Sequence, residues 1–391
     1  MTLNRNLKAM LAGWMTAALL ACGGGSGDGG AAGPLNGTLR LALTDAPSCG
    51  YDAVNITVQK VRVHQSATAL DTDSGWSEVV LAPAKRVNLL TLSNGVLEEL
   101  GQTPLPTGHY TQLRLVLASN DSAQPLANSV RPTGGAEVAL KTPSGQQSGV
   151  KANINIDIAA NQMADFVLDF DACKSVVSAG NSGQYLLKPV LSVVPRYVSG
   201  VMGYVDTGLV LTNTRVSVQQ AGVVIKATVP DSTGKFVLQP VAPGSYTLVL
   251  TTAGRASLVV TNVPVAAGSV TALNTNTTPL LPPPSASGTV NGVATVDTLV
   301  RATQSVAATT TVEVAGGFVD SVTGNYSFAL PVGAPLVAPY LVAPGVLVFG
   351  ADVPATGKYT LHASLSGFPD QTKVLSTLGA GATVTTNFTF P

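Results

Sequence analysis

Residues 108–117 read Gly-His-Tyr-Thr-Gln-Leu-Arg-Leu-Val-Leu, and this stretch decides the fold that the sequence predicts. Its leucines occupy every second position, which is the period of a half-buried β-strand, and Gln112 and Arg114 fall on the opposite face. Pro106 and Gly108 shape a turn before the strand, and Tyr110 then begins it with one ring face packed inward. The stretch therefore predicts a strand that is buried on one side.

The same signals recur along the chain. The pattern Gly-x-Tyr-Thr is found at residues 108–111, 244–247 and 357–360, each time within a few residues after a proline. A second shared element, at residues 231–236 and 321–326, predicts a turn that enters a strand. Alternating apolar residues predict further strands at Leu39, Leu41 and Leu43, at Val54, Ile56 and Val58, and at Ile154, Ile156 and Ile158.

The composition favours a β-rich protein that works outside the cytoplasm. The 391 residues include 40 glycines and 25 prolines, and only 11% are charged, against about 25% in an average soluble protein. Lys plus Arg equals Asp plus Glu at 21 each, so no basic field exists to attract nucleic acid. We predict an all-β fold of three β-sandwich domains in tandem, prealbumin-like or immunoglobulin-like. The helical spacing of apolar residues in 87–100 predicts a short helix in the N-terminal domain.

Residues 1–21 have the features of a lipoprotein signal peptide. A basic start is followed by an apolar stretch at residues 9–21, too short to span a membrane, which needs about 20 apolar residues. The stretch ends in Leu-Leu-Ala before Cys22, which predicts lipidation of that cysteine. The alternative is an ordinary secretory signal with an accidental cysteine. Residues 22–34, rich in Gly, Ala and Ser, predict a flexible tether, and Gly23 in place of an aspartate predicts sorting to the outer membrane.

Two cysteines remain after Cys22 is assigned to lipid. Cys49 and Cys173 are an even pair in an oxidising compartment, so we predict that they form a disulfide. Closing so long a loop could add about 4–5 kcal/mol of stability by the chain-entropy estimate. Metal binding by two isolated cysteines is the weaker interpretation.

Shifts in composition divide the rest of the chain. We expect an N-terminal β-sandwich domain at residues 35–197, a second sandwich at 198–274, a Pro-rich linker at 275–286 and a diverged second copy at 287–391. The last segment carries a strongly apolar insert at about residues 331–351. We interpret the insert as an extra pair of strands at one edge of the third sandwich, and its alternative role is an exposed partner patch.

The first segment resembles the bacterial domain of unknown function 4382 family. The resemblance rests on residues 43–47, 54–63, 87–90, 105–110, 113–115 and 169–174. It covers nearly the whole segment and implies a fold and an envelope location, but no chemistry.

The later segments resemble carboxypeptidase regulatory-like domains, which are transthyretin-like sandwiches. The matching residues are 200–206, 234–236 and 243–248, with a departure at Gly254-Arg255, where an aromatic residue is usual. Residues 366–368 keep that aromatic as Phe368 in the diverged copy. The resemblance implies spacer or adhesion modules and a fold related to carbohydrate-binding sandwiches, because a shared fold does not fix a function.

Catalytic and metal-binding patterns are scarce in this sequence. His64, His109 and His362 lie outside any zinc-peptidase pattern, and we interpret His64 and His109 as solvent-facing strand residues. No nucleophile elbow or phosphate-binding loop occurs, so we predict no catalytic residues and no cofactor.

One acidic group is a candidate metal site. Asp165, Asp169 and Asp171 alternate with Phe166, Leu168 and Phe170, which favours a solvated face opposite a core face. The alternative is a calcium site, which Asp157 or Asp45 could complete.

These observations favour a non-enzymatic cell-envelope lipoprotein that acts as a binding or structural module at the outer membrane. It would contact the membrane through its N-terminal lipid, with an unidentified protein or glycan partner and no nucleic acid. The first alternative is a carbohydrate-binding lipoprotein, although Trp76 is the one tryptophan left after the signal. A hydrolase is the remaining alternative, which the missing motifs disfavour.

Overall fold

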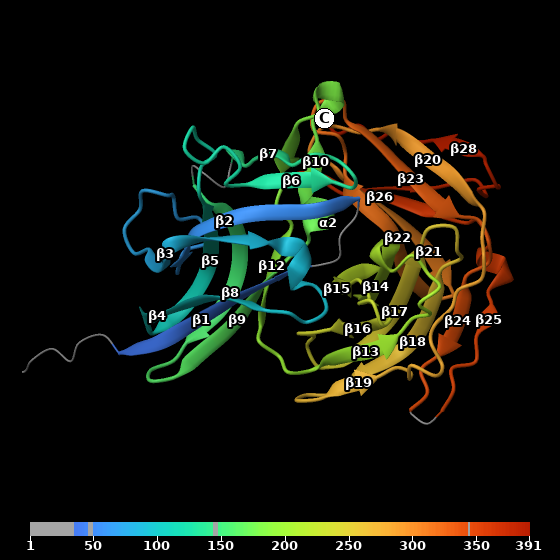
Figure 1. Cartoon of the computed structure of the whole chain (residues 1–391), viewed down its shortest axis with the longest axis horizontal. Coiled ribbons are helices and arrows are strands. Elements are labelled where there is room, and N and C mark those ends of the chain that lie inside the picture. Colours follow the sequence, from blue (N-terminus) through green and yellow to red (C-terminus); the bar gives the residue numbers. More distant parts are fainter. Residues whose placement is uncertain (1–34, 46–49, 144–147, 343–344) are drawn as a thin grey trace, which may run out of the picture. The chain divides into compact units, whose positions relative to one another are not determined.

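A computed structural model describes residues 35–45, 50–143, 148–342 and 345–391. These residues form six sheets and a few short helices, so the predicted all-β fold of several sandwiches is confirmed (Figure 1). The helical turn predicted within residues 87–100 is also confirmed as the 3-10 helix η1, Leu89–Leu92, which Asn88 caps by accepting from the backbone N–H of Leu90.

The first sandwich packs a four-stranded sheet on an eight-stranded one. In the first sheet the strand order is β12-β9-β1-β4. These strands are β1 (Asn36–Asp45), β4 (Glu98–Pro106), β9 (Met163–Phe170) and β12 (Leu191–Pro195). The order in the second is β10-β11-β7-β6-β2-β5-β8, with β3 beside β2. Its strands are β2 (Tyr51–His64), β3 (Ser77–Asn88), β5 (Gly108–Leu117), β6 (Ser129–Pro132), β7 (Val138–Lys141), β8 (Val150–Ile158), β10 (Val176–Ser178) and β11 (Tyr185–Leu187).

The apolar side chains of the predicted alternating strands fill the core between these two sheets. Its buried members include Leu39, Leu41, Leu43, Val54, Ile56, Val58, Leu113, Leu115, Leu117, Ile154, Ile156 and Ile158. Two short helices follow β9, namely α2 (Ala172–Ser175) and η2 (Gly180–Ser182).

The second sandwich combines a three-stranded sheet, β16-β13-β19, with a six-stranded sheet, β15-β14-β17-β18-β24-β25. The strands are β13 (Gly200–Tyr204), β14 (Thr214–Gln220), β15 (Val223–Thr228), β16 (Lys235–Leu238), β17 (Gly244–Thr252), β18 (Leu258–Val265), β19 (Val270–Ala272), β24 (Leu336–Pro339) and β25 (Gly350–Ala351), with η3 at Leu211–Asn213. The predicted linker packs on this sandwich, because the N–H of Leu280 donates to the Tyr204 carbonyl at 2.9 Å and its side chain is buried.

The third sandwich consists of the sheets β23-β20-β28 and β22-β21-β26-β27. The strands are β20 (Ser287–Val293), β21 (Leu299–Val306), β22 (Thr310–Phe318), β23 (Asn325–Pro331), β26 (Thr360–Ser364), β27 (Gln371–Val374) and β28 (Thr383–Thr385), with η4 at Val353–Ala355.

The apolar insert does not lie where the sequence placed it. Its strand β24 pairs in parallel with β18 of the second sandwich, from Leu258 beside Leu336 to Thr261 beside Pro339. The prediction that the insert fills an edge of the third sandwich is therefore wrong. The reason is that β18 would otherwise be an edge strand with unpaired backbone groups, and the insert covers that edge.

The repeated Gly-x-Tyr-Thr pattern has a common structural role. Tyr110, Tyr246 and Tyr359 are buried, and the first two donate from the hydroxyl to the carbonyl four residues back, at 3.1 and 2.9 Å. Tyr359 donates instead to the Pro331 carbonyl at 2.5 Å. In each sandwich the tyrosine thus fixes the start of a strand to a preceding segment, much as a tyrosine corner does.

Candidate functional site

The three candidate calcium ligands are held by three different partners. Asp165 accepts from Nε of Arg40 at 3.0 Å, and Asp169 accepts from Nζ of Lys226 at 2.6 Å. Asp171 accepts from the backbone N–H of Lys174 at 3.0 Å and so caps α2. Because each carboxylate faces its own donor, the three do not form one cation site. In the part of the chain that the structure describes, no cluster of three or more His, Cys, Asp or Glu could hold a metal.

Asp157 and Asp45, the two residues that could have completed the calcium site, have other partners as well. The Asp157 side chain is 85% exposed and lies 2.8 Å from Nδ1 of His109. Asp45 ends β1 and accepts from the backbone N–H of Ala172 at 2.9 Å, which ties the end of β1 to the start of α2.

The face that carries Asp165 and Asp169 is not a solvated one, as the alternation had suggested. Val167 is fully buried, and the Asp169 side chain is 11% exposed. The second sandwich covers Asp169 through Lys226 of β15, whose side chain is 1% exposed. A face that the sequence marks as polar is therefore an interface between two sandwiches.

A second buried ion pair joins the first sandwich to the third. Nζ of Lys174, in α2, lies 2.8 Å from Glu313 of β22, and their side chains are 8% and 1% exposed. Glu313 also meets the second sandwich through Gln219 of β14, which donates from Nε2 to its carbonyl at 2.9 Å and accepts from its N–H at 2.7 Å. We call the set Asp169, Lys174, Gln219, Lys226 and Glu313 the junction.

Two arginines extend the junction from the second and third sandwiches. Arg215 of β14 lies 3.9 Å from one oxygen of Glu313, and Arg301 of β21 lies 3.5 Å from the other. Arg301 also donates to the Gly222 carbonyl at 3.1 Å. All three sandwiches therefore contribute charged or polar side chains to one buried region.

Burial changes the acidity of the carboxyls in and beside this region. Loss of solvent raises the pKa of Asp45 well above its ordinary value, and the hydrogen bond from Ala172 opposes this only in part. Burial likewise raises the pKa of Asp169, although the Lys226 ammonium opposes the rise. The junction therefore holds charge at a cost, which the ion pairs Asp169–Lys226 and Lys174–Glu313 offset in part.

The chemistry available at the junction is chiefly structural. Ion pairs of this kind fix one arrangement of the parts they join, because a displaced partner leaves a buried charge unpaired. A cavity of about 140 Å³ beside Asp169, Asp171 and Lys226 is small, and those side chains already have partners. The junction thus holds the three sandwiches together and offers little room for a substrate.

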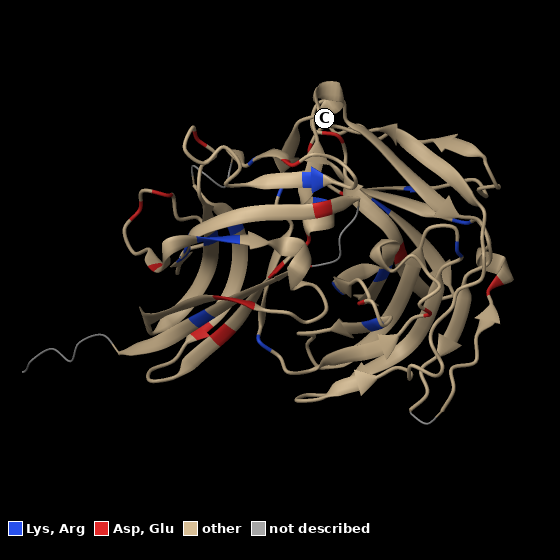
Figure 2. Ribbon diagram, in the orientation of Figure 1, with Lys and Arg blue, Asp and Glu red and all other residues tan. Residues whose placement is uncertain are grey.

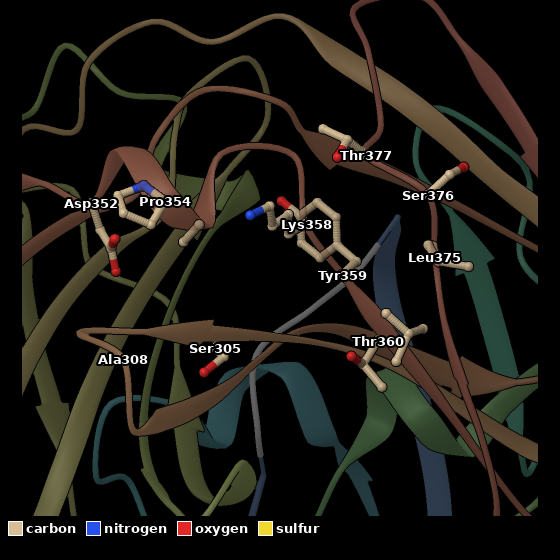
Figure 3. A pocket seen from close by; sticks show the side chains of 12 residues that line it. Ser305, Ala308, Asp352, Pro354, Lys358, Tyr359, Thr360, Leu375, Ser376 and Thr377 are labelled. Atoms are coloured by element: carbon tan, nitrogen blue, oxygen red, sulfur yellow. The ribbon is translucent and has the colours of Figure 1, made fainter.

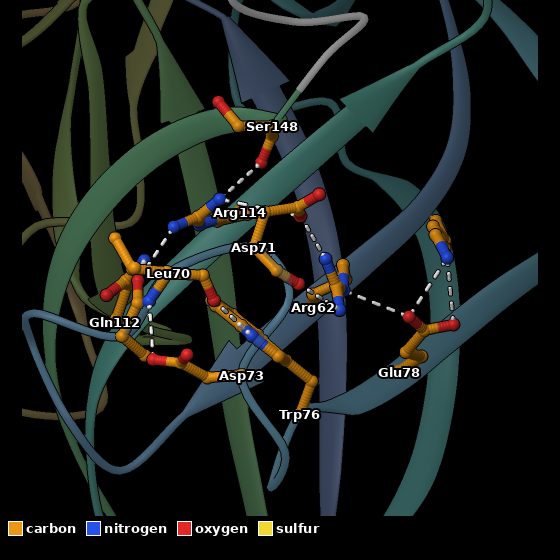
Figure 4. Close-up of polar contacts among 11 residues, drawn as sticks. Arg62, Leu70, Asp71, Asp73, Trp76, Glu78, Gln112, Arg114 and Ser148 are labelled. Carbon is orange, nitrogen blue, oxygen red and sulfur yellow. Dashed lines mark hydrogen bonds and ion pairs between the residues drawn. The ribbon is translucent and has the colours of Figure 1, made fainter.

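A second polar cluster surrounds Trp76 in the first sandwich (Figure 4). The guanidinium carbons of Arg62 and Arg114 lie 4.5 and 4.8 Å from the centre of the indole ring. The indole N–H donates to the Leu70 carbonyl at 2.9 Å, and Asp71 pairs with both arginines. The ring is half-buried and covered by cations, so it does not present the open face that a sugar platform needs.

The same cluster corrects the expectation for the opposite face of β5. Gln112 and Arg114 are buried, because the segment that leads to Trp76 covers them. Both donate to the Ala69 carbonyl, at 3.3 and 2.8 Å. The polar side of this strand therefore holds down a loop instead of facing solvent.

A larger cavity lies in the third sandwich (Figure 3). Its volume is about 520 Å³, and Asp352, Lys358 and Tyr359 contribute to its walls together with the hydroxyl residues Ser305, Thr360, Ser376 and Thr377. Burial raises the pKa of the Tyr359 hydroxyl well above its ordinary value. Asp352 accepts from the backbone N–H of Ala307 at 2.6 Å. The cavity could take a small hydroxyl-rich ligand.

The histidines make local contacts. Nε2 of His64 lies 3.0 Å from the Ser74 carbonyl, and the ring packs 5.0 Å from that of Trp76. His362 lies 3.0 Å from the Thr303 hydroxyl, and burial lowers its pKa. Like His109, these side chains serve strand and loop contacts.

The predicted lipidation site and half of the predicted disulfide lie outside the described residues. Cys22 and Cys49 both belong to such segments, while Cys173 lies in α2. In the described part of the chain, no helix is long and apolar enough to cross a membrane. Lipidation of Cys22 and the Cys49–Cys173 bond stay predictions.

Sequence reasoning missed the charged residues that form the junction. Lys226 follows Val223-Val224-Ile225, and Glu313 lies between Val312 and Val314, so each is a lone charge in an apolar strand. Such a position is the available signal, since charged side chains are almost never fully buried unless paired.

The first sandwich matches a known family. Residues 36–189 match the profile described as "Domain of unknown function (DUF4382)", which confirms the resemblance of this segment. The match spans less than half of the chain. No curated protein matches the sequence. The resemblance of the later segments to carboxypeptidase regulatory-like domains stays a prediction.

Solved structures with some likeness include three bacterial proteins. One is a type II cohesin–X-dockerin complex from Acetivibrio cellulolyticus, a C-terminal interface mutant, with 30% identity over 21% of this chain and a TM-score of 0.18. The chain spans 55% of that protein's length. The major pilin SpaA of Corynebacterium diphtheriae has 11% identity over 90% of this chain and 99% of its own, with a TM-score of 0.18. A Ca²⁺-stabilized ice-binding adhesin of an Antarctic bacterium has 11% identity over 89% of this chain and 74% of its own, with a TM-score of 0.11. Scores this low carry no argument about function.

Proposed function

We propose that the chain is a non-enzymatic cell-envelope lipoprotein, held in the outer membrane by lipid on Cys22, and that it serves as a binding or structural module. The observation that carries the proposal is the set of buried ion pairs that join the sandwiches. Asp169, Lys174, Lys226 and Glu313 are paired across sandwich boundaries and fix the sandwiches to one another. A module built this way presents its surfaces in one fixed arrangement.

The anchor supports this assignment from the sequence side. The apolar stretch at 9–21, the Ala21-Cys22 step and the Gly-rich residues 23–34 are the expected parts of a lipoprotein start. Acylation at Cys22 would hold the module at the bilayer, and Gly23 in place of an aspartate favours the outer membrane.

Metabolic labelling with a clickable fatty acid tests the anchor. Wild-type chain should take up label and fractionate with the outer membrane, and Cys22→Ala chain should do neither. Cys173→Ala is the matched control, because it removes a cysteine but leaves the acylation site, so it should keep the label. A wild-type chain without label, or a labelled Cys22→Ala chain, refutes the proposal.

Carbohydrate binding is the second candidate, and the cavity in the third sandwich favours it. Its walls carry several hydroxyl groups beside Asp352 and Lys358, and such polar groups suit a saccharide. The covered ring of Trp76 is evidence against a sugar platform in the first sandwich. On a glycan array, binding that the cavity-filling variant Ser305→Trp abolishes supports this candidate, and an array without binding refutes it.

The disulfide belongs to the same proposal. The hydrogen bond from Ala172 to Asp45 brings the end of β1 beside α2, so Cys49 is only four residues along the chain from a neighbour of Cys173. A peptide map of unreduced protein should show Cys49 and Cys173 in one cross-linked fragment. Free thiols at both positions contradict the pairing.

A further inference from the structure

One end of the first sandwich is built from three chain segments, residues 35–39, 103–108 and 158–164, which we call the β1 tip. Backbone hydrogen bonds tie them together: Thr107 N–H donates to the Leu35 carbonyl at 2.9 Å, and Asn161 N–H to the Asn36 carbonyl at 2.9 Å. The pairing of β1 with β4 and β9 continues directly from these bonds. The tip is therefore part of the sheet and not a loose extension of it.

Gly37 makes this close approach possible. A Cβ at this position would lie 2.3 Å from the Ala159 carbonyl oxygen, nearer than real Cβ atoms come. The three segments are thus held at a fixed separation by backbone contacts.

The tip exposes apolar side chains and carries no charge. Leu35 is 63% exposed and Met163 is 53% exposed. Residues 35–39, 103–108 and 158–164 contain no Asp, Glu, Lys or Arg, and Figure 2 shows no acidic or basic residue on these turns, where the chain enters β1. The first charged side chains along β1 and β9, Arg40 and Asp165, pair with each other. On β8, Asp157 precedes Ile158 of the tip, is 85% exposed and lies 2.8 Å from Nδ1 of His109.

The chain outside the described residues indicates what covers this surface. Leu35 follows Cys22 by thirteen residues, which span at most about 45 Å even when fully extended. This reach rests on the proposed lipid at Cys22. Such a tether keeps the tip at a high effective concentration near the bilayer. Even a weak apolar contact between the tip and the bilayer then forms for most of the time.

We propose that the β1 tip docks on a lipid bilayer, with Leu35 and Met163 inserted at the level of the headgroups. Exposed apolar side chains suit this interfacial zone, where their burial is favourable and a charged group such as Asp157 can stay among the polar headgroups. The contact orients the module, because the sandwich sheets continue rigidly from the tip.

Quenching by brominated phospholipid tests the proposal. The acylated chain is reconstituted in vesicles of phosphatidylethanolamine and phosphatidylglycerol, with Trp76→Phe as background and Met163→Trp as reporter. Val210→Trp is the matched control, because Val210 is 62% exposed in the second sandwich. We expect brominated lipid to lower the fluorescence of the tryptophan at position 163 at least twofold. The fluorescence of the tryptophan at position 210 should fall by less than a tenth. Adding Leu35→Asp should at least halve the quenching at position 163.

A second arm separates docking from acylation. A histidine tag in place of residues 1–22, bound to vesicles that contain a nickel-chelating lipid, supplies a tether without the natural lipid. Quenching at position 163 in this arm supports docking even where fatty-acid labelling of Cys22 fails. An acylated or tagged chain without quenching at position 163 overturns the proposal. So does a concentration-dependent blue shift without vesicles, because it identifies a second copy of the chain as the occupant.

Discussion

The ion pair between Lys226 and Asp169 allows a sharp test of the junction. Nζ and Oδ1 are 2.6 Å apart, and the side chains are 1% and 11% exposed. Lys226→Met keeps most of the apolar stem and its volume, so the packing loss is small. The Asp169 carboxylate then stays buried without its cation. Breaking a buried pair in this way costs about 3–5 kcal/mol, or a fall in Tm of about 10 °C.

The assay is urea unfolding at pH 8, followed by far-ultraviolet circular dichroism, with a thermal scan in parallel. Lys60→Met is the matched control, because its pair with Glu78 is about a third exposed on both sides, and such pairs contribute about 0–1 kcal/mol. The double variant Lys226→Met with Asp169→Leu should return to within about 1 kcal/mol of wild type, since it removes both charges.

The pH dependence gives a further check on the cause. The raised pKa of Asp169 means that its carboxyl takes up a proton more readily in the folded state, so the penalty of Lys226→Met should be smaller at pH 5 than at pH 8. A loss below 1 kcal/mol at pH 8, equal to that of Lys60→Met, would show that the junction does not depend on paired buried charge.

Three other predictions follow from the fold. Asp45 has a raised pKa, so its folded form binds more protons than its unfolded form and its contribution to stability falls as pH rises above about 4; Asp45→Asn should therefore show a smaller drop in Tm between pH 5 and pH 8 than wild type does. Tyr246→Phe should lose about 1 kcal/mol in urea unfolding, because it removes one buried hydroxyl-to-carbonyl bond, and an unchanged midpoint would contradict that role. Ala338→Asp places a charge at the fully buried Ala338 of β24, which costs several kcal/mol, so hydrogen exchange of β18 amides should quicken at least tenfold. Val342→Asp, at a position 74% exposed, should leave that exchange unchanged.

The alternation of apolar and polar residues was enough to predict the strands. It did not show what covers the polar face of each strand. Leu113, Leu115 and Leu117 are core residues as predicted. Gln112 and Arg114 looked solvent-facing, yet they bind the Ala69 carbonyl of a loop more than 40 residues earlier. A period of two distinguishes the faces of a strand, but only tertiary packing decides whether the polar face meets water or protein.

The junction could not be predicted from the sequence for the same reason. Asp169 is 57 residues from Lys226 along the chain, and Lys174 is more than twice as far from Glu313. The sequence allowed Asp165, Asp169 and Asp171 to be interpreted as a cation cluster because it does not show their partners, which lie in β1, in β15 of the second sandwich and in α2. The family resemblance is confirmed for residues 36–189, but it carried no information on contacts with the rest of the chain.

The pairing of β24 with β18 has a consequence for how the protein matures. A chain that crosses a membrane from its N-terminus delivers β18, ending at Val265, well before β24, which begins at Leu336. Until then the sheet of the second sandwich has an open edge that can pair with any other strand it meets. On the proposed export route, the sheet closes only in the last steps, and a chain truncated before residue 336 should be prone to aggregate rather than simply lack part of its third sandwich.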